Sequence, residues 1–188
     1  MAAGADSGQA VAVPPPAHGH VALELHLGEL RQLFNSMDPA PFRERDLDPR
    51  ASDYIVDWAT EVPADQSLAM VVHLGTPTPD TALVGDAVRE YFRGRAVAKR
   101  RELSKLFRVG RISLVIGLAF LGVAIVAGET LAALLSKESY AWLAKESLVI
   151  GGWVALWRPL EIFLYDWWPL RAQAKLYDRL SRMQVIVP

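Results

Sequence analysis

Three short segments of the chain have the apolar pattern of β-strands. Residues 20–27, HVALELHL, alternate apolar side chains with Glu24 and His26, which is typical of a half-buried strand. Residues 67–74, SLAMVVHL, predict a second strand. The last residues, MQVIVP, alternate again, and we expect residues 183–187 to add a third strand, because two strands alone form a marginal sheet.

A helix is predicted between the first two strands. Asp48 suits the N-cap and Pro49 the first helical position, and apolar residues then recur at helical spacing until Pro63. Residues 20–88 are therefore expected to form a small acidic domain. With the helices described below, the predicted fold class is α+β.

The longest predicted helix begins near Ala82 and carries nine Arg and Lys residues between positions 89 and 111. It continues without a break into 17 uncharged residues, Ile112–Gly128. A helix of ~20 apolar residues crosses the hydrocarbon core of a bilayer. The pattern predicts a basic juxtamembrane helix, 89–111, followed by a transmembrane helix, 112–135.

A second transmembrane helix is predicted at 147–168, after an extracytoplasmic loop at 136–146. Its first eleven residues are uncharged but too few to cross a bilayer, so the helix has to include the charged stretch WRPLEIFLYDWW. Arg158 is then expected near mid-depth in the bilayer. Asp166 is expected near the cytoplasmic interface, in contact with water.

Arg158 and Glu161 are three residues apart, so they can pair on one helix face and lower the cost of a charge in the membrane. Three interpretations stay open. The pair is an intramembrane polar site for an ion, a lipid headgroup or a partner helix; it is a self-satisfied pair that fixes hairpin or oligomer geometry; or the helix ends near Arg158 and the following residues lie along the interface. Trp157, Trp167 and Trp168 are the expected interface anchors.

Charge divides the chain into two halves. Residues 1–88 hold 13 acids and 4 bases, whereas residues 89–188 hold 8 acids and 16 bases. Bases before the first span and after the second predict that both termini are cytoplasmic, with a C-terminal segment at 169–188. The basic helix is expected to contact anionic lipid rather than nucleic acid, with attraction to the acidic domain as an alternative use. The residues for this contact are Arg100, Arg101, Lys105, Arg108 and Arg111.

Candidate chemistry is sparse. The chain has no cysteine, which excludes thiolate nucleophiles and thiolate metal sites. His26 and His73 fall on polar strand faces without a ligand spacing, and the acidic loop around Asp46 and Asp48 is expected to cap a helix rather than to bind a cation. No nucleotide-binding or hydrolase motif is present. We therefore predict no enzyme activity, no metal site and no cofactor.

Two further patterns bear on organisation. The Ala- and Pro-rich residues 1–19 lack the basic and apolar regions of a signal peptide and predict a disordered tail. Small residues spaced by four favour close helix packing within the hairpin or between copies. These pairs are Ser113–Gly117, Ala124–Gly128 and Gly151–Ala155.

Three phrases, PFRERDLDPRASDYIVDWA, GRISLVIGLAFL and WRPLEIFLYDWWPL, resemble a group of short bacterial inner-membrane proteins that have no assigned function. The resemblance covers residues 20–188. It implies a bacterial origin, two spans and a cytoplasmic domain, and it supplies no catalytic residues.

The leading hypothesis is a non-enzymatic, membrane-anchored scaffold or accessory subunit that presents the cytoplasmic domain at the bacterial inner membrane. Its expected partners are membrane lipids and either further copies of the chain or another membrane protein. One alternative is a subunit of a small oligomeric channel or transporter that uses Arg158 and Glu161. Another is a membrane enzyme that acts on lipid through Glu161 or Asp166.

Overall fold

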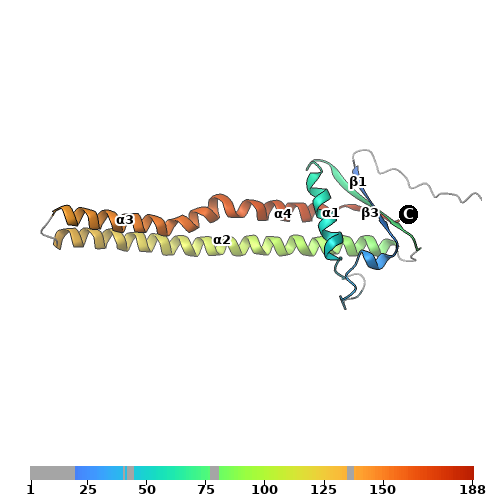
Figure 1. The fold of residues 1–188 in the computed structure, drawn as a ribbon, viewed down its shortest axis with the longest axis horizontal. Coiled ribbons are helices and arrows are strands. Elements are labelled where there is room, and N and C mark those ends of the chain that lie inside the picture. Colours follow the sequence, from blue (N-terminus) through green and yellow to red (C-terminus); the bar gives the residue numbers. More distant parts are fainter. Residues whose placement is uncertain (1–19, 40, 42–44, 77–80, 135–137) are drawn as a thin grey trace, which may run out of the picture. The chain divides into compact units, whose positions relative to one another are not determined.

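The computed structural model describes residues 20–39, 41, 45–76, 81–134 and 138–188. The chain forms two compact units (Figure 1). The first, an α+β unit, combines Met1–Ala96 with Lys175–Pro188, and the second, a helical unit, is Val97–Ala174. The predicted tail, 1–19, lies outside the described residues.

The α+β unit contains a three-stranded parallel sheet with the order β1-β2-β3. Its strands are β1 (His20–Leu27), β2 (Ser67–Leu74) and β3 (Gln184–Ile186). The strand predicted at 183–187 is therefore confirmed, and so is the α+β class.

Parallel strands need a crossover connection, and this chain has two of very different length. The first crossover, from β1 to β2, passes through the 3-10 turn η1 (Leu30–Gln32) and α1 (Pro49–Glu61). The second, from β2 to β3, holds every long helix: α2 (Thr81–Leu134), α3 (Glu138–Glu161), the π-helical turn η3 (Ile162–Asp166) and α4 (Trp167–Leu180). The helical unit is thus an insertion in a β–α–β crossover.

Helix α1 begins as predicted, with Asp48 as its N-cap and Pro49 in the first turn. The backbone N–H of Arg50 donates to Asp48 Oδ1 at 2.9 Å, which satisfies one of the free donors at the helix start. The helix buries Ser52, whose Oγ accepts a hydrogen bond from the Tyr91 hydroxyl of α2 at 3.1 Å. This bond pairs a polar group that would otherwise be costly to bury.

One face of the sheet forms the core with the helices. The apolar positions predicted for this face pack together in a single cluster, together with side chains of α1, the first part of α2 and the end of α4. The members that are fully buried include Leu33, Ile55, Met70, Val72, Val84, Val88, Phe92 and Leu180. The other face carries Glu24 and His26 on β1 and His73 on β2, as the alternation requires.

The C-terminal part of α4 is tied to the loop between α1 and β2 by Arg179. Its guanidinium donates to the carbonyl oxygens of Val62 at 3.0 Å, Pro63 at 2.5 Å and Gln66 at 2.8 Å. A planar fork with several N–H donors is suited to hold three carbonyls of one turn.

A second arginine, Arg95 of α2, contacts Tyr177 of α4. Its guanidinium donates a hydrogen bond to the Tyr177 hydroxyl at 3.4 Å, and this bond raises the pKa of Arg95 above its ordinary value.

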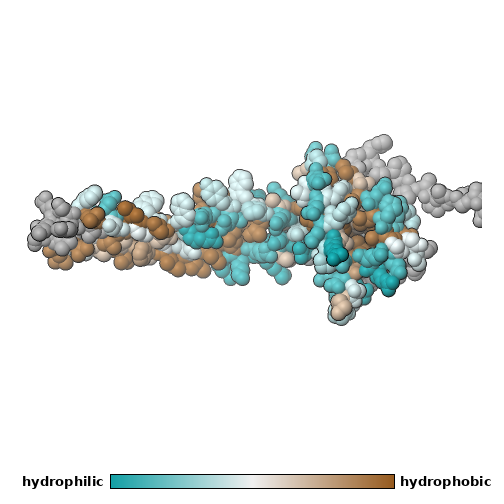
Figure 2. Space-filling model, in the orientation of Figure 1, coloured by the Kyte–Doolittle hydropathy of each residue, from teal (hydrophilic) through white to brown (hydrophobic). Residues whose placement is uncertain are grey.

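The helical unit is an antiparallel hairpin in which the later part of α2 lies beside α3, η3 and the start of α4 (Figure 1). Two of its helical stretches, Leu83–Leu131 and Lys145–Leu180, are long and apolar enough to cross a membrane. Only 17% and 22% of their most apolar windows are buried, and Figure 2 shows an apolar surface around the α2–α3 part of the hairpin. The large exposed apolar side chains there include Val115, Ile116, Phe120, Val123, Val126, Ile150, Trp153 and Val154.

Glycines set the register of the hairpin. A Cβ atom at Gly117 would lie 2.8 Å from Leu156 Cδ2 and 3.0 Å from the Ala155 carbonyl oxygen, and one at Gly110 would lie 2.8 Å from Ile162 Cγ2. Moving seven residues along α2, from Gly110 to Gly117, therefore corresponds to moving seven residues in the reverse direction along the second helix, from Ile162 to Ala155. At the other end, a Cβ at Gly128 would meet Lys145 Cα at 3.4 Å, in the same register.

The residues of the predicted small-residue pairs differ in how they pack within the hairpin. Gly117, Ala124 and Gly128 are buried along the hairpin. Gly151, however, faces open space, and its neighbour Gly152 packs against Leu121. Within the hairpin the packed glycine is therefore Gly152, and packing of Gly151 between copies stays a prediction.

Helix boundaries also differ from the prediction at the hairpin turn. Helix α3 begins at Glu138, so most of the loop expected at 136–146 is helical, while residues 135–137 lie outside the described residues. The second helix does not end near Arg158. It continues through η3 and α4 to Leu180.

Candidate membrane-interface site

The charged stretch that interrupts the second apolar helix forms a polar cluster of four side chains, which we call the Arg158 cluster. Arg158 Nη1 lies 3.1 Å from Glu161 Oε2 and 3.1 Å from Asp166 Oδ2. The indole Nε1–H of Trp157 donates to the other oxygen of Glu161 at 2.9 Å. The expected contact between Arg158 and Glu161 is present, and Asp166, which was expected to contact water, is also a partner of Arg158.

Local backbone geometry explains why Asp166 can reach Arg158. Eight residues of regular α-helix span ~12 Å and do not return to the same face. The π-helical turn Ile162–Asp166 has more residues in each turn, so it rotates Asp166 back toward the face of Arg158. Pro159 lies one turn earlier inside the helix, where it removes a backbone donor and favours irregular geometry.

The hairpin register shows which part of α2 lies opposite Arg158. This residue lies between the levels of Gly117 and Gly110 on α2, opposite about Val115, roughly one turn inside the uncharged stretch that begins at Ile112. The next level, around Asp166 and Trp167, faces Phe107, whose ring centroid lies 6.4 Å from that of Trp167. Relative to α2, Arg158 is therefore near the basic end of the apolar segment and not at its middle.

The direction of the Arg158 side chain agrees with this level. Its guanidinium contacts Asp166, which lies two turns further toward the basic end of the hairpin. Long cationic side chains near a helix end commonly extend toward the polar layer in this way. The Arg158, Glu161 and Asp166 side chains are 62%, 38% and 34% exposed, so the cluster lies on the outside of the hairpin.

Aromatic side chains surround the same level. The predicted anchors Trp157 and Trp168 are largely exposed, whereas Trp167 is half-buried and donates its indole N–H to the Phe163 carbonyl at 2.9 Å. The Arg171 guanidinium lies over the Trp167 ring at 5.5 Å. Indole rings with one polar and one apolar edge are characteristic of membrane interfaces.

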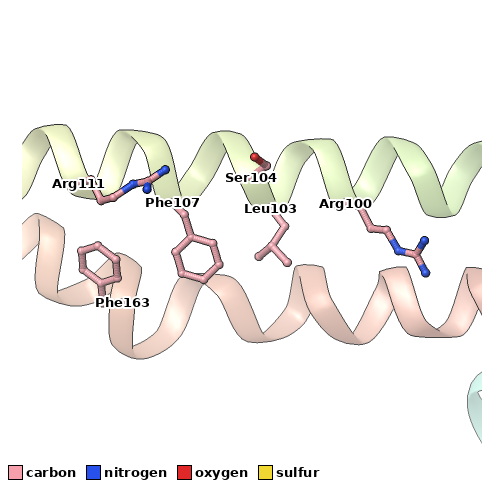
Figure 3. A pocket seen from close by; sticks show the side chains of 6 residues that line it. All are labelled: Arg100, Leu103, Ser104, Phe107, Arg111 and Phe163. Atoms are coloured by element: carbon pink, nitrogen blue, oxygen red, sulfur yellow. The ribbon is translucent and has the colours of Figure 1, made fainter.

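The predicted lipid-contacting bases lie on α2 beside this cluster, and two of them border a groove of about 480 Å³. Figure 3 shows Leu103 and Phe107 pointing from α2 toward the facing helix, Phe163 of that helix beside Phe107, and Arg100 and Arg111 at the two ends. The Phe107 and Phe163 rings are stacked at 6.1 Å and form the apolar floor. Guanidinium groups at both ends of an apolar floor match the chemistry of an anionic headgroup attached to acyl chains.

Not every predicted base lines this groove. Arg101, Lys105 and Arg108 are exposed on α2 outside it. A second groove, also about 480 Å³, shares Leu103, Phe107 and Phe163 with the first. It is bordered by Arg171 and Trp167. Arg171 was not among the predicted lipid-contacting bases, and Trp167 was predicted only as an interface anchor. Recognising Arg171 required the pairing of α2 with α4, which has no signature in the local sequence.

A second group of side chains, on the α+β unit, was missed. Glu24, His26 and His73 place their potential ligand atoms within 4.8 Å of one another. His26 and His73 are direct neighbours in the β1–β2 register, and their rings stack at 4.5 Å with an interplanar angle of 14°. The sequence places both histidines on polar strand faces, but only the parallel register brings them together.

The comparisons with known proteins add no family. Neither the protein-family models nor the curated proteins and solved structures gave a match to this chain. The resemblance to short bacterial inner-membrane proteins therefore stays a prediction, and the functional argument rests on the residues.

Proposed function

We propose that this protein is an integral protein of the bacterial inner membrane that works as a non-enzymatic scaffold or accessory subunit. In this proposal the helical unit crosses the bilayer as a hairpin, and the α+β unit is held at the cytoplasmic face. The proposal is carried by one observation: the apolar windows of the hairpin helices leave roughly four-fifths of their residues outside any core. The core helix of a soluble protein would bury such residues, because exposed apolar surface of this extent is unfavourable in water.

Charge supports the proposed orientation. The bases of α2 precede its uncharged stretch, and Arg171, Lys175, Arg179 and Arg182 follow the second one, whereas the connection at 136–146 has two bases, balanced by two acids. An excess of Arg and Lys marks cytoplasmic segments. Each base near an anionic leaflet contributes ~1 kcal/mol of attraction, so the Arg-bordered grooves favour binding of phosphatidylglycerol-type headgroups.

The geometry of the Arg158 cluster favours anchoring over a channel. Arg158 is paired twice within its own helix, by Glu161 and Asp166, and the cluster lies at the level where basic residues and tryptophans gather. A path for ions would need such a cluster to face a lumen formed by several copies. Self-association, with or without a lumen, stays a prediction, as does the lipid-acting enzyme.

Membrane extraction tests the anchor. The full chain should stay in the membrane pellet after washing with alkaline carbonate and should enter solution only with detergent. Release by carbonate as a monodisperse protein would contradict membrane insertion.

Native mass spectrometry of the detergent-purified chain tests the lipid contact. Phosphatidylglycerol should be retained in preference to phosphatidylcholine, and R100Q/R111Q should reduce that preference. The matched variant R31Q/R50Q, which removes two exposed bases of the α+β unit, should leave it unchanged. Equal loss in both variants would mean that only total charge matters and would contradict a specific groove.

A further inference from the structure

Glu24, His26 and His73 have the chemistry and the proximity of a metal site. Their potential ligand atoms lie within 4.8 Å of one another, on the side of the sheet opposite the core cluster. Two imidazoles and one carboxylate are a donor set that zinc and related divalent ions use in proteins. None of the three belongs to the membrane-interface site.

The strand register holds these three side chains in place. His26 and His73 are paired across parallel strands, and Glu24 precedes His26 by two residues, so it projects from the same face of β1. Because the register fixes both histidine Cα positions, little backbone order would have to be created on binding. Two of the three side chains are exposed and the third is half-buried, so an ion can reach them from solvent.

The location also favours a ligand. His26 and His73 are the penultimate residues of β1 and β2, so the group lies at the carboxyl edge of the parallel sheet. Open sheets of parallel strands commonly bind ligands beyond this edge. The backbones of β1 and β2 are still hydrogen-bonded at this edge, since the Gly75 N–H donates to the Leu27 carbonyl oxygen at 2.9 Å.

We propose that Glu24, His26 and His73 bind one divalent transition-metal ion of the zinc class. Zinc–nitrogen and zinc–oxygen bonds are about 2.0–2.2 Å, so two ligand atoms on one ion lie at most about 4 Å apart. The 4.8 Å separation exceeds this limit by less than an ångström, which rotation of the exposed Glu24 and His26 side chains can close. The ion would join β1 to β2 and keep a coordination position open for water or a fourth ligand.

The test is metal binding by the full chain, purified in detergent without a polyhistidine tag. Zn²⁺ binding is measured by competition with a chromophoric chelator, and Co²⁺ is used as a spectroscopic probe of coordination. We expect one ion per chain, with the visible bands of a four- or five-coordinate Co²⁺ site. H26Q and H73Q should each weaken Zn²⁺ binding by more than ~10-fold, and E24Q should weaken it less, because two imidazoles remain.

The chain offers a matched control in its two other histidines, His18 and His20. H18Q/H20Q should bind Zn²⁺ with unchanged affinity and stoichiometry. Far-UV circular dichroism and a cooperative melt verify that H26Q and H73Q are folded, and Zn²⁺ should raise the melting temperature of the wild type but not of H26Q/H73Q. The proposal is overturned if no ion binds, if stoichiometric binding survives in folded H26Q/H73Q, or if H18Q/H20Q abolishes it.

Discussion

Phe92 is fully buried in the α+β unit, whereas Phe120, in the middle of the uncharged stretch of α2, is 52% exposed. The contrast is general: Met70, Val72 and Val88 are inaccessible, while Val115, Val123 and Val126 of the hairpin lie on its surface. The same types of apolar residue are thus buried in the α+β unit and exposed in the hairpin. The first set is removed from water by a protein core, and the second set is exposed, which the proposed insertion into a membrane would explain.

The largest expected effect comes from truncating the same residue type in both units. Phe92→Ala should destabilise the α+β unit by ~3–5 kcal/mol, because it leaves a cavity in a closed core. Phe120→Ala should change the stability of the detergent-solubilised protein by less than ~0.5 kcal/mol, since the side chain has few protein contacts to lose. Hydrogen exchange of β2, compared between the two variants, separates the effects. Equal protection of β2 in both would contradict the assignment of Phe92 to the core.

A smaller effect is expected from an arginine that belongs only to the α+β unit. Arg179→Ala removes three hydrogen bonds to carbonyls of one loop and should destabilise the unit by ~1.5–3 kcal/mol. Arg179→Lys should recover only part of this, because an ammonium lacks the planar fork. Thermal melts of these variants are compared with Arg182→Ala, whose side chain is 74% exposed. A melting temperature that falls equally in R179A and R182A would show that the carbonyl contacts do not matter.

Two adjacent glycines test the packing of the hairpin. Gly152→Leu meets the backbone and side chain of Leu121 and should destabilise the hairpin by ~1–3 kcal/mol through overpacking. Gly151→Leu adds the same side chain at a position where, among the described residues outside its own helical turn, no atom lies within 4 Å of the added Cβ, and it should be tolerated. Retention of a monodisperse species after heating in detergent reports on both. The opposite ranking would mean that α3 is rotated relative to its assigned face.

The smallest effect is expected at the Arg158 cluster. Arg158→Ala, Glu161→Gln and Asp166→Asn should each cost less than ~1 kcal/mol, because partly exposed ion pairs contribute little. A pair buried in the bilayer would instead cost ~3–5 kcal/mol when one partner is removed. A double-mutant cycle with thermal melts distinguishes the two values, and a coupling well above 1 kcal/mol would contradict the interfacial level.

Most of the helices and strands could be predicted, because each is specified by a local pattern of residues. The alternation of β1, the proline and aspartate at the start of α1, and the uncharged run of α2 each specify their own element. The parallel sheet could not be predicted, since alternation is the same in either direction. The strand predicted at 183–187 already placed the hairpin before the last strand of the sheet, but it did not show that β3 pairs with β2, or that this pairing is parallel.

The candidate site was predicted in part for the same reason. The spacing of Arg158 and Glu161 identified one pair. Asp166 contacts Arg158 only because of the π-helical turn, which could not be predicted from the residue types. Mid-depth was inferred by counting from Ser147 along one helix, whereas the level of Arg158 relative to α2 follows only from the packing of the two helices. Gly151 and His26 show the same limit, because helix rotation and strand register arise from tertiary packing.

Insertion of the hairpin, with Arg158 at its cytoplasmic edge, is tested most directly by cysteine accessibility on the natural cysteine-free background. Single cysteines at positions 116, 120, 123, 150 and 154 should be protected from a membrane-impermeant maleimide applied to either face of sealed membranes. Cysteines at 165, 168 and 172 should react when the reagent is applied at the cytoplasmic face. Ready labelling at 120 and 154 in intact membranes, or protection of 165 and 168 from both faces, would contradict this arrangement.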